Sequence, residues 1–91
     1  MNLTQLYTIL KERQAHPHPE SYTARLLAEG LPRIAQKVGE EATEVVVATL
    51  SQDDRRLTEE IADLAYHVLV LMVARGLTPE DIAAELERRH R

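Results

Sequence analysis

The sequence predicts an all-α protein. Ala, Leu, Glu and Arg are abundant in the chain, and all four residues have high helix propensity. No segment alternates apolar and polar residues for long enough to indicate a β-strand, and Phe and Trp are absent. Capping residues, prolines and glycines divide the 91 residues into about five helices, and a chain of this length is expected to form one small domain, residues 1–91.

Two helices are expected in the first third of the chain. Asn2 can cap a first helix that runs to about Gln14, and the two prolines of the following HPHP loop (residues 16–19) prevent that helix from continuing. Ser21 then caps a short second helix over residues 22–29. The glycine that follows is typical of a helix C-terminus.

Two long helices follow, joined by a short polar turn. The third helix has Pro32 in its first turn and reaches about Leu50. The fourth runs from about Arg55 to Arg75 and ends at a glycine. Because the SQDD turn between them (residues 51–54) is short, we expect the two helices to be antiparallel neighbours.

The charge balance argues against a nucleic acid as partner. The net charge is −4, whereas a phosphate backbone is bound by clustered Lys and Arg. The one basic cluster, residues 88–91, lies at the end of an expected fifth helix, where cations favour the helix dipole. That helix begins at residues 78–81, where a Thr cap, a Pro and two acids follow one another.

The sequence also suggests where the protein resides. It contains no cysteine, so a disulfide framework and a thiolate metal site are excluded. Residues 1–10 lack the basic and apolar segments of a signal peptide, and the most apolar run, residues 61–74, is shorter than the roughly 20 residues that cross a membrane. We therefore expect a cytoplasmic protein with no membrane partner.

The fourth helix is apolar nearly all round. Ile61, Leu64 and Val68 lie on one face, while Ala65 and Leu69 cover others. A helix of this kind is buried on most sides, and one chain of this size has too few helices to bury it. We therefore expect the two long helices to pair with those of a second chain in a four-helix bundle, as a homo-oligomer that is at least a dimer.

Acidic residues recur at matching spacings on the two long helices. Glu41 and Glu44 lie on the third helix, and Glu60 and Asp63 lie on the fourth. Each pair is spaced i, i+3, which places both carboxylates on one face of its helix. Glu40 is i, i+4 from Glu44 and can join that face.

Either acidic pair alone is more typical of a solvated helix surface, but the apolar residues around the two pairs favour a metal-binding site. Asp63 lies inside the most apolar run, and three valines follow Glu44. Carboxylates that converge in a sheltered groove repel by about 4 kcal/mol per close pair at an effective dielectric constant of about 20, so either they take up protons or a cation neutralises them. Oxygen ligands without cysteine favour Mg²⁺, Mn²⁺ or Ca²⁺, and Lys37 is placed to meet a phosphate that arrives with the metal.

Three stretches resemble the phosphoribosyl-ATP pyrophosphohydrolase family of histidine biosynthesis, within the MazG-like all-α nucleoside triphosphate pyrophosphohydrolases. They are SYTARLLAEG (residues 21–30), KVGEEATEVVVATL (residues 37–50) and EIADLAYHVLVLMVARGL (residues 60–77). The resemblance extends over residues 20–87. It implies Mg²⁺-dependent hydrolysis of N1-(5-phosphoribosyl)-ATP to N1-(5-phosphoribosyl)-AMP and pyrophosphate, the second step of L-histidine biosynthesis.

The resemblance also implies roles for individual residues. The implied metal ligands are Glu41, Glu44, Glu60 and Asp63, with Glu40 as a further candidate. The implied substrate-binding residues are Ser21, Tyr22, Thr23 and Lys37. Either Glu41 or Glu44 is implied as the base that activates the attacking water, and the sequence leaves that choice open.

Other interpretations compete with this one. A carboxylate-bridged di-iron bundle needs two Glu-x-x-His pairs, and the chain has one, Glu87 with His90. A helical dimerisation module leaves the acids and Gly39 without an explanation. A relative that acts on ordinary or damaged nucleotides is the serious alternative. His67 is either a partner of the site or a buried histidine bonded to a neighbouring helix, and Tyr66 is expected to pack with its hydroxyl on a polar partner.

Overall fold

The computed structural model describes residues 1–90, and over that range the chain is all-α, as the sequence predicts. The helices are α1 (Leu3–Ala15), α2 (Tyr22–Glu29), α3 (Leu31–Ser51), α4 (Asp54–Arg75) and α5 (Pro79–Arg89). The expected boundaries at Gln14, Leu50 and Arg55 each differ from the observed ones by a single residue. The expectation that the fifth helix continues through Arg91 lies partly outside the described residues.

Capping side chains begin the helices where the sequence predicts them. The Asn2 carboxamide accepts a hydrogen bond from the backbone N–H of Gln5, whose own side chain accepts from the N–H of Asn2, both at 2.8 Å. Ser21 and Thr78 accept from the third residue of α2 and of α5 in the same way. The cap of α4 is Asp53, which the sequence indicated only as part of a polar turn.

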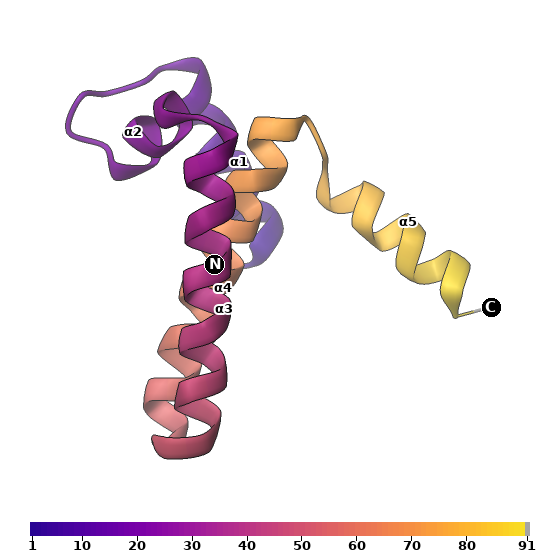
Figure 1. Ribbon diagram of the computed structural model, residues 1–91. Coiled ribbons are helices and arrows are strands. Elements are labelled where there is room, and N and C mark those ends of the chain that lie inside the picture. Colours follow the sequence, from indigo (N-terminus) through magenta and orange to yellow (C-terminus); the bar gives the residue numbers. More distant parts are fainter. Residues whose placement is uncertain (91) are drawn as a thin grey trace.

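The long helices α3 and α4 form an antiparallel hairpin, and this pairing is the most extensive in the molecule (Figure 1). Only Gln52 and Asp53 separate them, which confirms the short turn. The helices α1 and α2 pack beside the open end of this hairpin, where α3 begins and α4 ends (Figure 1). The hairpin thus positions residues in the middle of α3 opposite the first half of α4.

The hydrophobic core lies at the open end of the hairpin. Its buried members are Tyr7, Leu10, Leu26, Ile34, Leu69, Val70, Met72 and Val73. The hydroxyl of Tyr7 donates a hydrogen bond to the backbone oxygen of Leu77 at 2.7 Å, which connects α1 to the segment that follows α4. Toward the closed end, apolar side chains of both helices are exposed, among them Val46, Leu50 and Ile61. One protomer therefore leaves part of its apolar surface uncovered.

The last helix projects away from the hairpin (Figure 1). Gly76, with a φ of 73°, ends α4 in the left-handed conformation that favours glycine. The chain direction then changes by 104° between α4 and α5. Within Pro79–Arg89, α5 buries none of its residues. In the described part of the chain no single helix is long and apolar enough to cross a membrane, and only the bent pair α4 and α5 together reaches that length and composition.

Candidate active site

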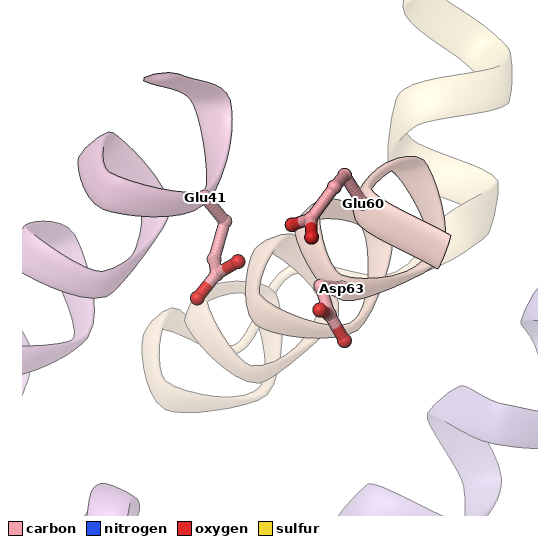
Figure 2. A group of neighbouring side chains, drawn as sticks. All are labelled: Glu41, Glu60 and Asp63. Carbon is pink, nitrogen blue, oxygen red and sulfur yellow. The ribbon is translucent and has the colours of Figure 1, made fainter. Parts of the chain in front are cut away.

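Three carboxylates from the two long helices meet in the middle of the hairpin. Glu41, Glu60 and Asp63 each offer an oxygen, and these oxygens all lie within 4.8 Å of one another. Figure 2 shows Glu41 on α3 across from Glu60 and Asp63 on α4. The antiparallel hairpin thus brings one acid of the first predicted pair to both acids of the second, and three carboxylates this close suit a hard divalent cation.

The three acids, which we call the acidic triad, differ in their exposure to solvent. Glu60 is 6% exposed and the side chain of Glu41 is 13% exposed, whereas Asp63 is exposed. Two of the carboxylates are therefore sheltered by the hairpin. The third faces the side from which a ligand can approach.

The other two acids of the predicted set lie apart from the acidic triad. Glu44 is exposed on α3 and is not part of the group within 4.8 Å. Glu40 is also exposed, and its carboxylate accepts hydrogen bonds from the side chains of Gln36 at 2.9 Å and Lys37 at 3.4 Å. These two bonds, that of Gln36 first, hold the pKa of Glu40 below its usual value.

A basic residue accompanies each sheltered acid. The ammonium of Lys37 lies 3.2 Å from an Oε1 of Glu41, one turn along α3. Burial by itself lowers the pKa of Lys37, but its hydrogen bonds to Glu41 and Glu40, helped by the field of the nearby Tyr22, raise the pKa above its usual value. On α4, Nη2 of Arg56 donates a hydrogen bond of 2.7 Å to Glu60.

Arg56 is a site residue that the sequence analysis missed. Its i, i+4 spacing from Glu60 is the signal that could have identified it, because such pairs meet on one helix face. The same spacing occurs on many exposed helices. Only the burial of Glu60 shows that this pair borders the site.

The residues around the start of α2 occupy three different environments. Ser21 caps the helix, Tyr22 is partly exposed, and Thr23 is buried. The hydroxyl of Thr23 shares a hydrogen bond with that of Tyr66, which confirms the polar partner expected for Tyr66. Burial raises the pKa of the Tyr66 phenol, although the bond to Thr23 opposes that increase.

His67 is buried on α4, beside Tyr66. Its Nε2 lies 3.0 Å from the hydroxyl of Tyr22 on α2. The interpretation of His67 as a buried histidine bonded to a neighbouring helix is therefore confirmed. This contact links the SYT start of α2 to the helix that carries Glu60 and Asp63.

Comparison with known proteins supports one family. The family model described as phosphoribosyl-ATP pyrophosphohydrolase matches residues 3–90. The phosphoribosyl-ATP pyrophosphatase of Lacticaseibacillus casei is 53% identical over 88 residues, which are 97% of this chain and 80% of that protein. The enzyme of the same name from Sulfurisphaera tokodaii is 52% identical, over 96% of this chain and 93% of the relative.

A longer relative contains the same region. The histidine biosynthesis bifunctional protein HisIE of Gloeobacter violaceus is 48% identical over 98% of this chain, which corresponds to 40% of that protein. The family model and the two pyrophosphatases extend over nearly the whole chain, including both long helices and the acidic triad. The chain therefore belongs to the phosphoribosyl-ATP pyrophosphohydrolase family.

Proposed function

We propose that the chain is a cytoplasmic, Mg²⁺-dependent hydrolase that converts N1-(5-phosphoribosyl)-ATP to N1-(5-phosphoribosyl)-AMP and pyrophosphate, the second step of L-histidine biosynthesis. The observation that carries the proposal is the acidic triad, held within 4.8 Å across the α3–α4 hairpin of a chain with this family membership. The proposal assigns the whole reaction to one domain that spans residues 1–91.

The acidic triad fits a magnesium ion by the chemistry of its donors. Glu41, Glu60 and Asp63 would hold the metal through carboxylate oxygens, which Mg²⁺ prefers, and water or phosphate oxygens would complete its shell. When bound, the metal supplies positive charge to the triphosphate and to the departing pyrophosphate. The sheltered position of Glu60 keeps this charge in a region less screened by water than the surface.

Glu44 has two possible tasks in this scheme. It lies one helical turn from Glu41, so it can complete the ligand set once substrate is bound, or it can take the proton of the attacking water. Its position outside the acidic triad favours the second task, because a carboxylate that is not saturated by metal keeps its basicity. Glu41 is the alternative base.

The basic residues beside the acidic triad suit the phosphates. Lys37 and Arg56 compensate the charges of Glu41 and Glu60, and a divalent cation held by these two acids would supply that compensation in their place. Both side chains can then turn to phosphate oxygens, where Arg offers paired donors and Lys a point charge. The N–H groups at the start of α2, after Ser21, add donors for the same ligand.

Exposed apolar residues on the far side of α3 support a homo-oligomer that is at least a dimer. Val46 is 58% exposed and Leu50 is 82% exposed. Gly39 lies on the same stripe, seven residues before Val46, and a Cβ added there would meet nothing within 4 Å. Packing within the protomer thus gives no reason for this glycine, whereas close approach of a helix from a second copy does.

A comparison of substrates tests the proposed reaction. With Mg²⁺, the purified chain is expected to release pyrophosphate from phosphoribosyl-ATP at least about a hundredfold faster, in kcat/KM, than from ATP or dCTP, a difference of roughly 2.7 kcal/mol in transition-state binding. Equal or higher rates on the ordinary triphosphates would instead assign the chain to relatives that act on general nucleotides. Removal of Mg²⁺ with a chelator is expected to abolish turnover.

A further inference from the structure

The imidazole of His67 is hydrogen-bonded on both sides. Its Nδ1 lies 2.7 Å from the backbone oxygen of Asp63, one turn earlier on α4, and its Nε2 lies 3.0 Å from the hydroxyl of Tyr22 on α2. The residue is only 6% exposed, and the ring of Tyr66 packs against it edge-on, with ring centres 4.9 Å apart. The ring is therefore held by both its polar and its apolar contacts.

These contacts determine where the protons lie. A backbone carbonyl only accepts, so Nδ1 must carry the hydrogen that is donated to Asp63. In the neutral ring Nε2 then has a free electron pair, and the partner that donates to it is the hydroxyl of Tyr22. With its proton committed to His67, the oxygen of Tyr22 can only accept a hydrogen bond from any further group.

The position of Tyr22 makes this restriction relevant to substrate. Tyr22 is 43% exposed, and His67 connects its hydroxyl to the backbone of Asp63, a member of the acidic triad. Lys37, which contacts Glu41, provides a cation on the other helix of the triad. An exposed hydroxyl held in this way offers a bound ligand an acceptor, and it cannot donate to a phosphate oxygen.

We infer that His67 is a positioning residue that orients Tyr22 as a hydrogen-bond acceptor for a donor group of the nucleotide, a sugar hydroxyl or a base amino group. Phosphate recognition is left to cations such as Lys37. This inference rests on the proposed function for the identity of the ligand. The proton arrangement itself rests only on the contacts of His67, so it can be tested in the absence of any substrate.

The first test observes the ring directly. Nitrogen-15 NMR of the histidine side chains in the ligand-free chain, at neutral and mildly alkaline pH, is expected to show the His67 proton on Nδ1 and a bare Nε2. Substitution Tyr22→Phe is expected to shift the Nε2 resonance and leave the proton on Nδ1. A proton on Nε2 in the wild-type chain would overturn the inference whether or not the chain hydrolyses phosphoribosyl-ATP.

The second test is a double-mutant cycle in KM. Tyr22→Phe and His67→Leu are each expected to raise KM for phosphoribosyl-ATP about five- to tenfold, as for one neutral hydrogen bond, with little change in kcat. Because His67 acts through Tyr22, the double variant is expected to be no worse than either single variant. His67→Gln, whose side-chain oxygen can accept from Tyr22, is expected to restore most of the affinity.

Two comparisons complete the experiment. Inorganic tripolyphosphate lacks both the sugar hydroxyls and the base amino group, so its inhibition constant is expected to be the same in wild type and Tyr22→Phe. An equal loss for tripolyphosphate and substrate, or additive effects in the cycle, would refute the acceptor role. Tyr7→Phe makes the same chemical change on α1, where the hydroxyl bonds to the backbone oxygen of Leu77 and to no residue of the site, and is expected to leave KM unchanged. A further comparison identifies the donor. If wild type binds 2′- or 3′-deoxy ATP more weakly than ATP, whereas Tyr22→Phe binds both equally, the donor is a sugar hydroxyl.

If His67→Leu fails to fold, the Tyr22→Phe variant still tests the positioning role of His67. Tyr22→Phe deletes one oxygen from a residue outside the core, so the NMR result and the comparison of substrate with tripolyphosphate remain measurable. Both expected results are required. A changed KM with an unchanged Nε2 resonance would show that Tyr22 acts without His67, and would overturn the positioning role.

Discussion

At the scale of single residues, the acidic triad shows that sequence spacing and the packing of the neighbouring helix separately determine which acids come together. The i, i+3 rule places Glu41 and Glu44 on one helix face, yet only Glu41 reaches Glu60 and Asp63. Residues three apart differ by about 60° around the helix axis, and that angle decides which of the two faces the neighbouring helix. The difference places Glu41 among the acids that meet between the two helices and leaves Glu44 on the exposed surface of α3.

The first prediction concerns the carboxylates of the acidic triad. Asp63→Asn and Glu41→Gln are each expected to lower turnover at least about a hundredfold, because the metal loses a charged ligand. Asp63 is exposed, so its variant is expected to keep the wild-type circular dichroism. Pyrophosphate release and calorimetric Mg²⁺ titration provide the measurements.

A neighbouring acid provides the matched control for this prediction. Glu59 is exposed on α4, next to Glu60, and lies outside the acidic triad. Glu59→Gln is expected to retain turnover and Mg²⁺ affinity. Wild-type turnover in Asp63→Asn would show that Asp63 is not a metal ligand.

The second prediction concerns Tyr66 at alkaline pH. Burial raises the pKa of its phenol above that of the unfolded chain, so the folded state holds this proton more tightly. Stability from this source is complete below pH about 10, the unfolded value, and is lost as the pH rises through the folded pKa. Denaturant unfolding of wild type and Tyr66→Phe at neutral pH and above pH about 10 is expected to show wild type losing more stability. Parallel losses in both proteins would contradict the assignment.

At the scale of helices, the hairpin depends on a very short connection. Only Gln52 and Asp53 lie between α3 and α4, and the side chain of Asp53 accepts a hydrogen bond of 2.9 Å from the N–H of Arg56. The cap fixes the first turn of α4, from which Glu60 is less than two turns away. The start of α4 therefore affects the register of the acids on the two helices.

The third prediction tests this cap. Asp53→Ala is expected to lower the free energy of unfolding by about 1 kcal/mol, because an N–H at the start of α4 loses its acceptor. Asp53→Asn keeps an acceptor of the same shape and is expected to cost much less. Chemical denaturation measures the free energy of unfolding of both variants. Equal values for Asp53→Ala and Asp53→Asn would show that the capping hydrogen bond does not cause the loss of stability.

Most helix boundaries could be predicted from the sequence because their signals are local. Asn2, Ser21 and Thr78 act on residues three positions away, and these contacts do not depend on the rest of the fold. The bond between Tyr22 and His67 joins residues 45 positions apart, so no local pattern indicates it. For the same reason the four acids could be selected from the sequence, but their division into the acidic triad and Glu44 depended on how α3 and α4 pack.

At the scale of the whole molecule, two of the surfaces that expose apolar side chains are available for association. One is the far side of α3, with Gly39, Val46 and Leu50, and the other is α5, which buries none of its own residues between Pro79 and Arg89. A protomer of this size has a thin core, so further burial of apolar side chains favours association. The dimer that we propose covers the first of these surfaces.

The fourth prediction tests that association. Leu50→Glu is expected to shift the chain toward monomer in sedimentation velocity, because a charge replaces an apolar side chain in the proposed interface. Leu3→Glu alters another exposed leucine, on α1, and is expected to leave the sedimentation coefficient unchanged. A wild-type chain that sediments as a folded monomer at micromolar concentration would refute the dimer.

Gly39→Ala separates two roles of the glycine. In a protomer with a free α3 surface, Ala is expected to stabilise the helix by up to about 1 kcal/mol. If a second copy approaches closely at this position, the added methyl group is expected to weaken the dimer instead. Unfolding at several protein concentrations distinguishes the two results.

The pairing of each sheltered acid with a basic residue of its own helix has a consequence for assembly. Lys37 with Glu41 and Arg56 with Glu60 balance the negative charge locally, and Asp63 is exposed to solvent. We therefore expect the newly made chain to fold before it binds the magnesium ion that we propose, unlike zinc fingers, which stay unfolded until the ion arrives. A chelator is then expected to abolish the activity of this protein reversibly, without unfolding it.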